Sequence, residues 1–287
     1  MSVVDIRNLT VRYGRTVAVD NVSIEAGRGM VYALLGRNGA GKSSIIRCLL
    51  GQRRADAGEA RLFGEDAWSH RANLMQRVGV VSEESDAPPE MTVASLARFC
   101  RSLYARWDQG AFESRMRTFG VPMAKRFGAL SKGQKRQVSL ALALAMSPDL
   151  IVLDDPTLGL DVVARKSLFE EVIGELADRG ISVFLTTHDL AGVETFADRV
   201  GILQRGRLVL DEDVDALKAR FRRIRFAARP AAIEPVALRS WGSGAEAIVS
   251  DYDDIAYERY RAAAAEIAPM TLEEIFVAVA GENGGAQ

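Results

Sequence analysis

The feature that most constrains the fold of this chain is a glycine-rich loop at residues 36–43, GRNGAGKS. It matches the pattern GxxxxGK[ST], follows an apolar run at residues 31–35 and precedes a helical run at residues 44–50. Glycines let such a loop curl around phosphates, and the first N–H groups of the helix attract anions. The loop therefore predicts a triphosphate site in which Lys42 contacts the β- and γ-phosphates and Ser43 coordinates Mg²⁺.

Other residues of the loop and of the helix start complete the predicted phosphate site. We assign six of them to nucleotide binding: Gly36, Asn38, Gly39, Ala40, Gly41 and Ser44. A glycine-rich turn that only caps a helix is the alternative, and the order of strand, loop and helix argues against it. A dinucleotide-binding loop is also disfavoured, because the pattern GxGxxG is absent here.

A second chemical feature is the acidic end of the apolar run at residues 150–153, which is followed by Asp154 and Asp155. The carboxyl ends of parallel strands meet at one edge of a sheet, so Asp154 is predicted to lie beside the glycine-rich loop. There its carboxylate can hold the hydration shell of Mg²⁺. An acidic pair that merely caps a strand is the alternative. Together the two features predict nucleotide binding.

Short apolar runs alternate with longer helical patterns in the first three quarters of the chain. The candidate buried strands are residues 31–35, 78–81, 150–153, 181–185 and 200–203. This alternation predicts an α/β fold, with a parallel sheet covered by helices on both faces. Residues 3–11 and 17–24 predict an antiparallel edge, and residues 84–146 predict a helical insertion.

The composition changes after Asp213, where a basic stretch at residues 220–229 begins a region of weaker apolar patterning. We therefore predict a main domain at residues 1–213 and a small α+β domain at residues 214–287 that docks on the main domain or on its twin. The tail at residues 281–287 is expected to be disordered.

The charge and cysteine content exclude several classes of protein. The 37 basic and 38 acidic side chains balance, so there is no electrostatic footprint for a nucleic-acid partner. Cys48 and Cys100 lack the spacing of metal ligands and are expected to be small buried side chains. The longest apolar run, residues 138–146, is far shorter than the roughly 20 residues of a membrane helix. Without a secretory signal either, the chain is expected in the cytosol.

The pentapeptide LSKGQ at residues 130–134 lies between the loop and the acidic strand. In this order the three motifs resemble the nucleotide-binding domain of ATP-binding cassette (ABC) ATPases, whose signature is LSGGQ. The resemblance covers about residues 1–213 and implies a P-loop NTPase fold with a RecA-like parallel core. It also implies two subunits that close around two MgATP molecules. Ser131, Gly133 and Gln134 of one subunit would then meet the nucleotide bound by the other, because a helix start attracts anions.

The resemblance assigns roles to three further residues. Tyr13 matches the aromatic that stacks on adenine, although an ordinary strand aromatic is the alternative. His188 follows the run at residues 181–185 and so reaches the same sheet edge as Asp154. In the family this histidine holds the γ-phosphate and the attacking water. Asp161 is expected to link the two sites across the dimer interface.

Two positions depart from the usual pattern of the family. Asp155 stands where most members carry the glutamate that acts as the base. Because its side chain is one methylene shorter, we expect it to act slowly, or only when a partner closes the site, alongside Lys42 and His188. Glu83 aligns with the usual glutamine that senses Mg²⁺, and its carboxylate can ligate the ion, although a solvated side chain is the alternative. These departures are similar to the YtrB-like branch of bacterial exporter ATPases.

The resemblance therefore implies an ATP-hydrolysing transporter subunit that works with a separate transmembrane permease on the inner face of the cell membrane. Export is favoured over import, and the second cassette is another copy or a homologous subunit. A soluble ABC ATPase in assembly or regulation is the alternative.

A helix of the permease is expected to dock on a groove with one wall at residues 92–107. Tyr104 and Trp107 are the candidate contacts, or else buried helical aromatics. Phe99 and Leu103 are spaced, with other apolar residues, for one face of the same predicted helix.

Overall fold

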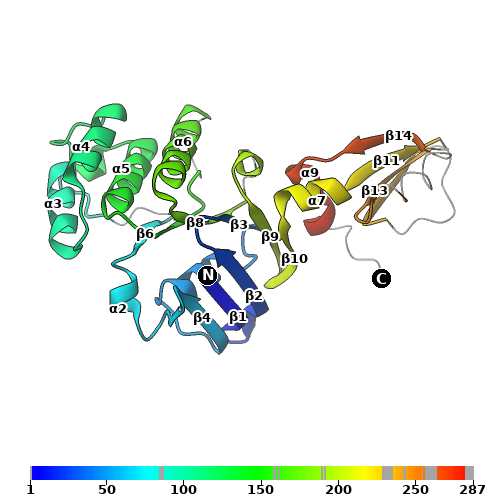
Figure 1. Cartoon of the computed structure of the whole chain (residues 1–287), viewed down its shortest axis with the longest axis horizontal. Coiled ribbons are helices and arrows are strands. Elements are labelled where there is room, and N and C mark those ends of the chain that lie inside the picture. The colour runs from blue at the N-terminus through cyan, green and yellow to red at the C-terminus, as the bar shows by residue number, and fades with distance from the viewer. Residues whose placement is uncertain are drawn as a thin grey trace.

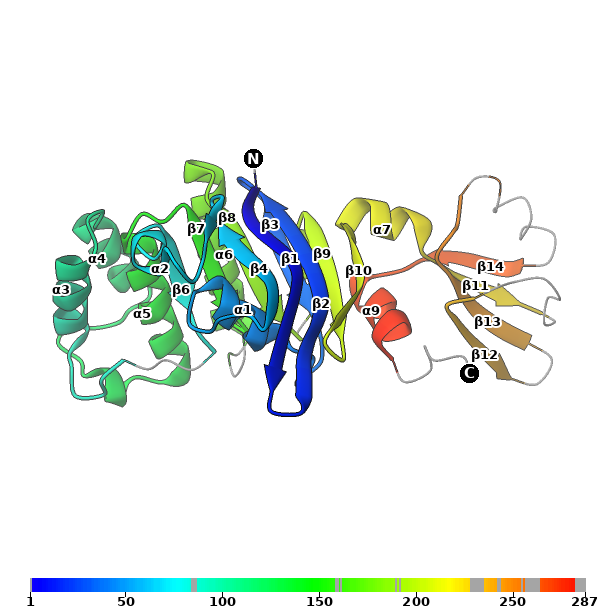
Figure 2. The ribbon, with the colours of Figure 1, turned by 90° about the horizontal axis from the view of Figure 1, so that it is seen from below.

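The chain folds into an elongated molecule built around a six-stranded sheet, with a helical end and a C-terminal sheet on opposite sides of it (Figure 1). This computed structural model describes residues 2–83, 87–157, 160, 162–188, 190, 192–227, 235–241, 244–253, 255 and 264–281. The same arrangement is seen from below in Figure 2.

The central sheet is parallel except at one edge. In spatial order its strands are β10 (Arg207–Asp213), β9 (Arg199–Gln204), β3 (Val31–Leu35), β8 (Ser182–Thr187), β7 (Leu150–Asp154) and β6 (Val78–Val81). Only the pair of β10 and β9 is antiparallel among these described strands. Strands β3 and β8 are buried along their whole length, which explains their continuous apolar runs. The predicted α/β fold is confirmed.

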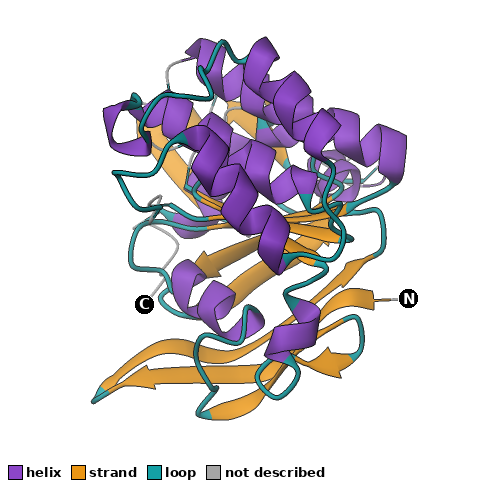
Figure 3. Cartoon of the chain, turned by 90° about the vertical axis from the view of Figure 1, so that its left-hand side faces the viewer, coloured by secondary structure: helices purple, strands orange, loops and turns teal. Residues whose placement is uncertain are grey.

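Two separate cores cover the two faces of this sheet. Tyr32 and Leu34 of β3 face a core shared with helix α1 (Lys42–Leu49), whereas Val31 and Ala33 face a core shared with α5 (Lys132–Ala145) and α6 (Val162–Arg179). Figure 3 shows the resulting layers, with most helices above the sheet and short helices and further strands below it. The alternation follows from the two-residue period of a strand.

The layer below α1 is an antiparallel sheet from the N-terminal part of the chain. Its strands, in spatial order, are β2 (Thr16–Gly27), β1 (Ser2–Tyr13), β4 (Ala57–Leu62) and β5 (Glu65–Asp66), with the short helix α2 (Arg71–Leu74) after them. Val4, Ile6 and Leu9 of β1 are buried against α1 and its neighbours. The antiparallel edge predicted at residues 3–11 and 17–24 is therefore present.

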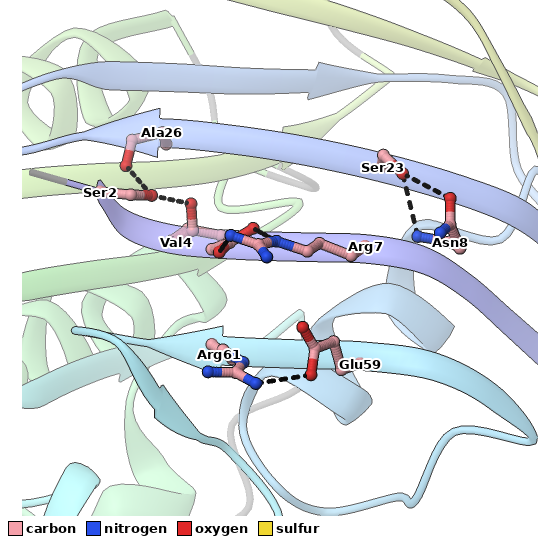
Figure 4. Close-up of polar contacts among 9 residues, drawn as sticks. Ser2, Val4, Arg7, Asn8, Ser23, Ala26, Glu59 and Arg61 are labelled. Atoms are coloured by element: carbon pink, nitrogen blue, oxygen red, sulfur yellow. Dashed lines mark hydrogen bonds and ion pairs between the residues drawn. The ribbon is translucent and has the colours of Figure 1, made fainter.

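The outer face of the antiparallel sheet is covered by polar pairs (Figure 4). Arg61 Nη2 lies 2.8 Å from Glu59 Oε2 within β4, and Ser23 of β2 bonds to Asn8 of β1. The guanidinium of Arg7 forms two hydrogen bonds to the Asp5 carboxylate. Exposed pairs of this kind contribute at most about 1 kcal/mol each. The buried face, not these pairs, therefore stabilises the sheet.

The helical end is built from α3 (Val93–Leu103), α4 (Gln109–Thr118), the turn η1 (Phe127–Ala129) and α5. Each α-helix begins at a side-chain cap, namely Thr92, Asp108 and Ser131. Such caps satisfy a free N–H group of the first turn, which explains where these helices begin. The described helices thus fill the interval in which the sequence predicts a helical insertion.

The C-terminal part forms a second antiparallel sheet and two helices. Its elements are α7 (Val214–Arg220), β11 (Arg222–Phe226), β12 (Ala237–Trp241), β13 (Gly244–Val249), β14 (Ala264–Pro269) and α9 (Leu272–Ala280). Leu217, Leu272 and Ile275 of the two helices belong to the same core as the central sheet. This part therefore packs against the central sheet, while the division at residue 213 stays a prediction. Of the tail expected to be disordered, only Gly281 lies within the described residues.

Candidate nucleotide site

Three parallel strands bring the predicted site residues to one edge of the central sheet. Strand β8 lies between β3 and β7, with Leu35 beside Thr187 and Asp154 beside Thr186. The first residue of the glycine-rich loop, Gly36, donates its N–H to the Thr187 carbonyl at 3.2 Å. The loop, the acidic pair and the segment after β8 thus meet at one place, as the geometry of parallel strands requires.

The glycine-rich loop needs its glycines at two positions for different reasons. Gly41 has φ 112°, and a Cβ there would lie 2.4 Å from the Ala18 carbonyl oxygen. A Cβ on Gly36 would lie 2.8 Å from the Leu203 carbonyl oxygen. Gly41 also precedes α1 without offering a side-chain cap, which leaves the start of the helix open to an anion. Ala40 is buried, whereas Asn38 and Gly39 are exposed.

Lys42 is buried, and its ammonium pairs with a carboxylate of the same chain. Its Nζ donates to the Gly36 carbonyl at 2.8 Å and lies 3.5 Å from Asp155 Oδ2. The side chains of Lys42 and Asp155 are only 5% and 8% exposed. A buried ammonium requires such a partner, because desolvation penalises an unpaired charge strongly. The carboxylate of Asp155 therefore lies against the lysine that is predicted to contact the phosphates.

Asp155 bridges Lys42 and His188. Its Oδ1 accepts the backbone N–H of His188 at 3.1 Å and lies 2.9 Å from His188 Nδ1. Its own N–H donates to the Thr186 carbonyl at 2.9 Å, and its φ of 42° is in the left-handed region. Residues other than glycine adopt this region rarely and at a cost in conformational energy. Strained backbone of this kind is common in functional sites.

Asp154 is held at the end of β7 by a neighbouring strand. Thr186 of β8, which is fully buried, donates its hydroxyl to Asp154 Oδ1 at 2.6 Å. No group of three or more His, Cys, Asp or Glu side chains suited to a metal occurs among the described residues. Mg²⁺ does not require one, since it binds through one or two carboxylates, water and phosphate oxygens. The side-chain oxygens of Asp154 and Ser43 are of the kind that this ion binds.

Arg136 is a residue of the site region that the sequence analysis missed. It is 6% exposed on α5 and donates to the carbonyls of Ser82 and, at 2.6 Å, of Glu83. Burial lowers the pKa of Arg136, while nearby carboxylates, first that of Glu83, act in the opposite direction. The sequence feature that indicates its burial is its position on α5, four residues before the buried Leu140 on the apolar stripe of this helix. The side chain of Glu83 itself is exposed.

We expect Arg136→Gln to lower the free energy of unfolding by about 1 to 3 kcal/mol, because it removes the guanidinium hydrogen bonds to the Ser82 and Glu83 carbonyls. Denaturant unfolding measures this change, with Lys132→Gln on the exposed face of the same helix as the matched control. Equal stability of the two variants would show that Arg136 does not hold the segment that carries Glu83.

The signature residues lie at the start of α5 and bond within their own helix. Gln134 N donates to Ser131 Oγ at 3.2 Å, and Ser131 N donates to Gln134 Oε1 at 3.3 Å, which forms a capping box. Gln134 Oε1 also accepts from Lys125 Nζ. Ser131 is exposed and Gly133 is partly exposed. Asp161 and most of the loop before it lie outside the described residues.

Tyr13 ends β1 next to the helix that follows the glycine-rich loop. It is 40% exposed, and its hydroxyl lies 3.5 Å from Ser44 Oγ and from Arg47 Nη1. The hydrogen bond from Ser44 is the main influence that lowers the pKa of Tyr13, with Arg47 and Arg53 adding to it. The structure thus places an accessible aromatic ring beside the predicted phosphate loop.

Comparison with known proteins places the chain in a family. A family model described as ABC transporter matches residues 19–158. The chain is 36% identical over 224 residues to the Nod factor export ATP-binding protein I of Burkholderia orbicola, covering 75% of this chain and 72% of that protein. It is 30% identical over 224 residues to the ABC transporter ATP-binding protein YtrB of Bacillus subtilis, covering 78% and 76%. The chain belongs to the ABC transporter family.

A solved structure of the ATP-binding subunit of an ABC transporter agrees with this assignment. It has a TM-score of 0.69 and 26% identity to this chain, and the match covers 76% of this chain and 92% of that one. The resemblance to ABC ATPases, including YtrB, is therefore confirmed. The protein is an ATP-binding subunit of this ATP-hydrolysing family. Within the described part of the chain, no helix has the length and apolar character needed to cross a membrane.

Proposed function

We propose that this ABC subunit dimerises around two MgATP molecules and hydrolyses them to drive export through a separate permease. The observation that carries the proposal is the contact of the buried Lys42 and Asp155 with each other and with the exposed His188 at the sheet edge beside the glycine-rich loop. It brings a phosphate-binding cation, a candidate base and a candidate positioning group together at this edge. The names of relatives, which include Nod factor export, favour export.

Mg²⁺ would be held by Ser43 and Asp154, with Glu83 as a third candidate ligand. When bound, the ion neutralises charge on the β- and γ-phosphates. Thr186 contributes by holding Asp154 Oδ1 at 2.6 Å, which orients the carboxylate. The exposure of Glu83 requires its side chain to turn inward to take part.

Binding of ATP exchanges one anion for another at Lys42. The γ-phosphate replaces the Asp155 carboxylate, which is then free to accept a proton from the attacking water. Oxygen from that water bonds to the γ-phosphorus as the bond to the ADP oxygen breaks, which releases ADP and phosphate. His188, already 2.9 Å from Asp155, orients the water and the γ-phosphate. The short side chain of Asp155 makes the step slow unless the dimer closes tightly.

The second half of each pocket is proposed to come from the partner subunit. The exposed start of α5, with Ser131, Gly133 and Gln134, offers N–H groups to the γ-phosphate held by Lys42 of the other chain. Asp161 is proposed to connect the two sites. ATP then acts as part of the interface, and its hydrolysis opens the dimer.

The permease is proposed to dock on α3, at the end of the molecule farthest from the C-terminal sheet (Figure 1). Phe99 and Leu103, which are spaced for one face of this helix, are 56% and 52% exposed. Trp107 instead packs against Phe112, with ring centroids 5.8 Å apart, and Tyr104 is partly buried. An exposed apolar pair on a short helix is suited to a partner helix. Docking there would hold the protein at the inner face of the membrane.

We expect Phe99→Glu to abolish copurification of a polytopic membrane protein from detergent-solubilised native membranes, because it puts a charge into the apolar contact. Thr118→Glu, on the exposed face of α4, is the control and should retain the partner. Mass spectrometry of the purified complex identifies the permease. If the unaltered chain recovers no membrane protein, the transport assignment is wrong and the soluble ATPase alternative is favoured.

A further inference from the structure

We propose that Arg53 is a positioning residue for the nucleoside, because its guanidinium covers one face of Tyr13 and leaves the other face for a purine base. The inference rests on the proposed role of Tyr13 in the nucleotide site. It adds the residue that sets the orientation of the ring, which lies beyond the glycine-rich loop and helix α1.

The guanidinium of Arg53 stacks on Tyr13. Its Cζ lies 4.2 Å from the centroid of the Tyr13 ring. The same side chain donates through Nη2 to the carbonyl of Arg12, and Nη2 lies 3.3 Å from Asp56 Oδ2. A planar guanidinium held at several points is pre-organised, which an ammonium on a flexible stem is not. Arg53 therefore forms a fixed layer beneath the ring.

The loop after α1 also holds the strand end that carries Tyr13. Asp56 Oδ2 accepts the backbone N–H of Arg12 at 2.7 Å, and Asp56 N donates to the Thr10 carbonyl at 2.9 Å. Both backbone groups of Arg12, the residue just before Tyr13, are thus bonded to Arg53 or Asp56. The hydrogen bond from Arg12 lowers the pKa of Asp56, so the carboxylate stays ionised in this role.

Protein groups therefore contact the hydroxyl edge and one face of the Tyr13 ring, which leaves the other face for a ligand. The hydroxyl at the edge is near Ser44 and Arg47 of α1, and Arg53 lies over one face. With 40% of the residue exposed, the opposite face is the one that a flat base can reach. A base stacked there would complete three layers, with the cation on the far side of the ring. The ring must be fixed because stacking depends on the angle between the two planes.

The test compares ligands that share the phosphates and differ in the base. Isothermal titration with MgATP and with Mg²⁺ plus inorganic tripolyphosphate measures the dissociation constants of the unaltered protein, Arg53→Ala, Tyr13→Ala and Arg54→Ala. Arg54 is the exposed neighbour and loses the same charge. We expect Arg53→Ala to weaken ATP binding about 3- to 10-fold and to leave tripolyphosphate binding within about twofold of Arg54→Ala. In steady-state assays the KM for ATP should rise by the same factor as the dissociation constant, while kcat stays within about twofold.

Arg53→Lys separates charge from shape and serves as the test if Arg53→Ala does not fold. Lysine keeps the charge but cannot lie flat on the ring while it bonds the Arg12 carbonyl, so ATP binding should stay weakened. Full recovery with lysine, or tighter ATP binding by Arg53→Ala, would overturn the inference. The latter result would mean that Arg53 occupies the face that the base needs.

Tyr13→Ala shows which proposal has failed. If it weakens ATP binding but Arg53→Ala matches Arg54→Ala, only the role of Arg53 is wrong. If Tyr13→Ala binds ATP as the unaltered protein does, the adenine role of Tyr13 is wrong, and the inference that rests on it is wrong too. Neither outcome affects the assignment of Lys42 to the phosphates, which the tripolyphosphate titration reports separately.

Discussion

Asp155→Asn is expected to bind MgATP more tightly than the unaltered chain and to hydrolyse it at least on the order of 10²-fold more slowly. The slower rate follows from the loss of the proposed base, since general base catalysis contributes 10²- to 10⁴-fold. The tighter binding follows from the contact of Asp155 Oδ2 with Lys42 Nζ at 3.5 Å, which ATP must displace. An amide competes with a phosphate less well than a carboxylate does.

The same variant should be less stable without nucleotide. Removing one partner of a buried ion pair typically costs about 3 to 5 kcal/mol, because the remaining charge is left uncompensated. Bound ATP supplies the missing anion, so MgATP should raise the melting temperature of Asp155→Asn more than that of the unaltered chain. Thermal unfolding with and without MgATP measures the difference.

Asp178→Asn, an acid-to-amide change at an exposed position of α6, is the control and should match the unaltered chain in all three measurements. Asp155→Glu tests the reach of the base separately. It should raise the rate in single-turnover assays, because a carboxylate misplaced by about 1 Å can cost on the order of 10²-fold. An unchanged or lower rate in Asp155→Glu, or weaker ATP binding by Asp155→Asn, would contradict the proposed role of Asp155.

The sequence predicted the parts of the site that depend on local pattern and strand geometry. Gly36, Asp154 and His188 each follow an apolar run, and parallel strands bring such positions to one edge whatever the details of packing. The contact between Asp155 and Lys42 could not be predicted in this way. It depends on the left-handed backbone of Asp155, which no neighbouring residue type requires.

The C-terminal sheet shows where sequence patterns fail for a different reason. Strand β11 contains three arginines in RRIRF, and the sequence alone indicates only a basic stretch there. Arg225 pairs with Glu246 of β13 and with Glu266 of β14, so its charge is matched only across strands. Such partners are distant in sequence, so the local composition of a strand does not predict them.

Lys42→Ala and Ser131→Arg are each expected to lower ATP turnover to background, for different reasons. Lys42→Ala removes the cation that holds the phosphates, and so should also lose nucleotide affinity. Ser131→Arg puts a bulky side chain at the exposed start of α5, where the partner's nucleotide is proposed to lie. It should bind ATP normally as a monomer but fail to dimerise with itself. Titration with ATP and analytical ultracentrifugation in MgATP distinguish these two losses.

The composite pocket, in which each ATP lies between Lys42 of one chain and Ser131 of the other, is tested most directly by mixing the two inactive variants. In a twofold dimer, each site would take these residues from different chains, so a mixed dimer keeps one intact site. Turnover of the equimolar mixture should rise above the sum of the separate proteins, to at most about half of the unaltered rate, because each mixed dimer keeps one of its two sites. A mixture with no more activity than that sum would contradict the two-subunit pocket.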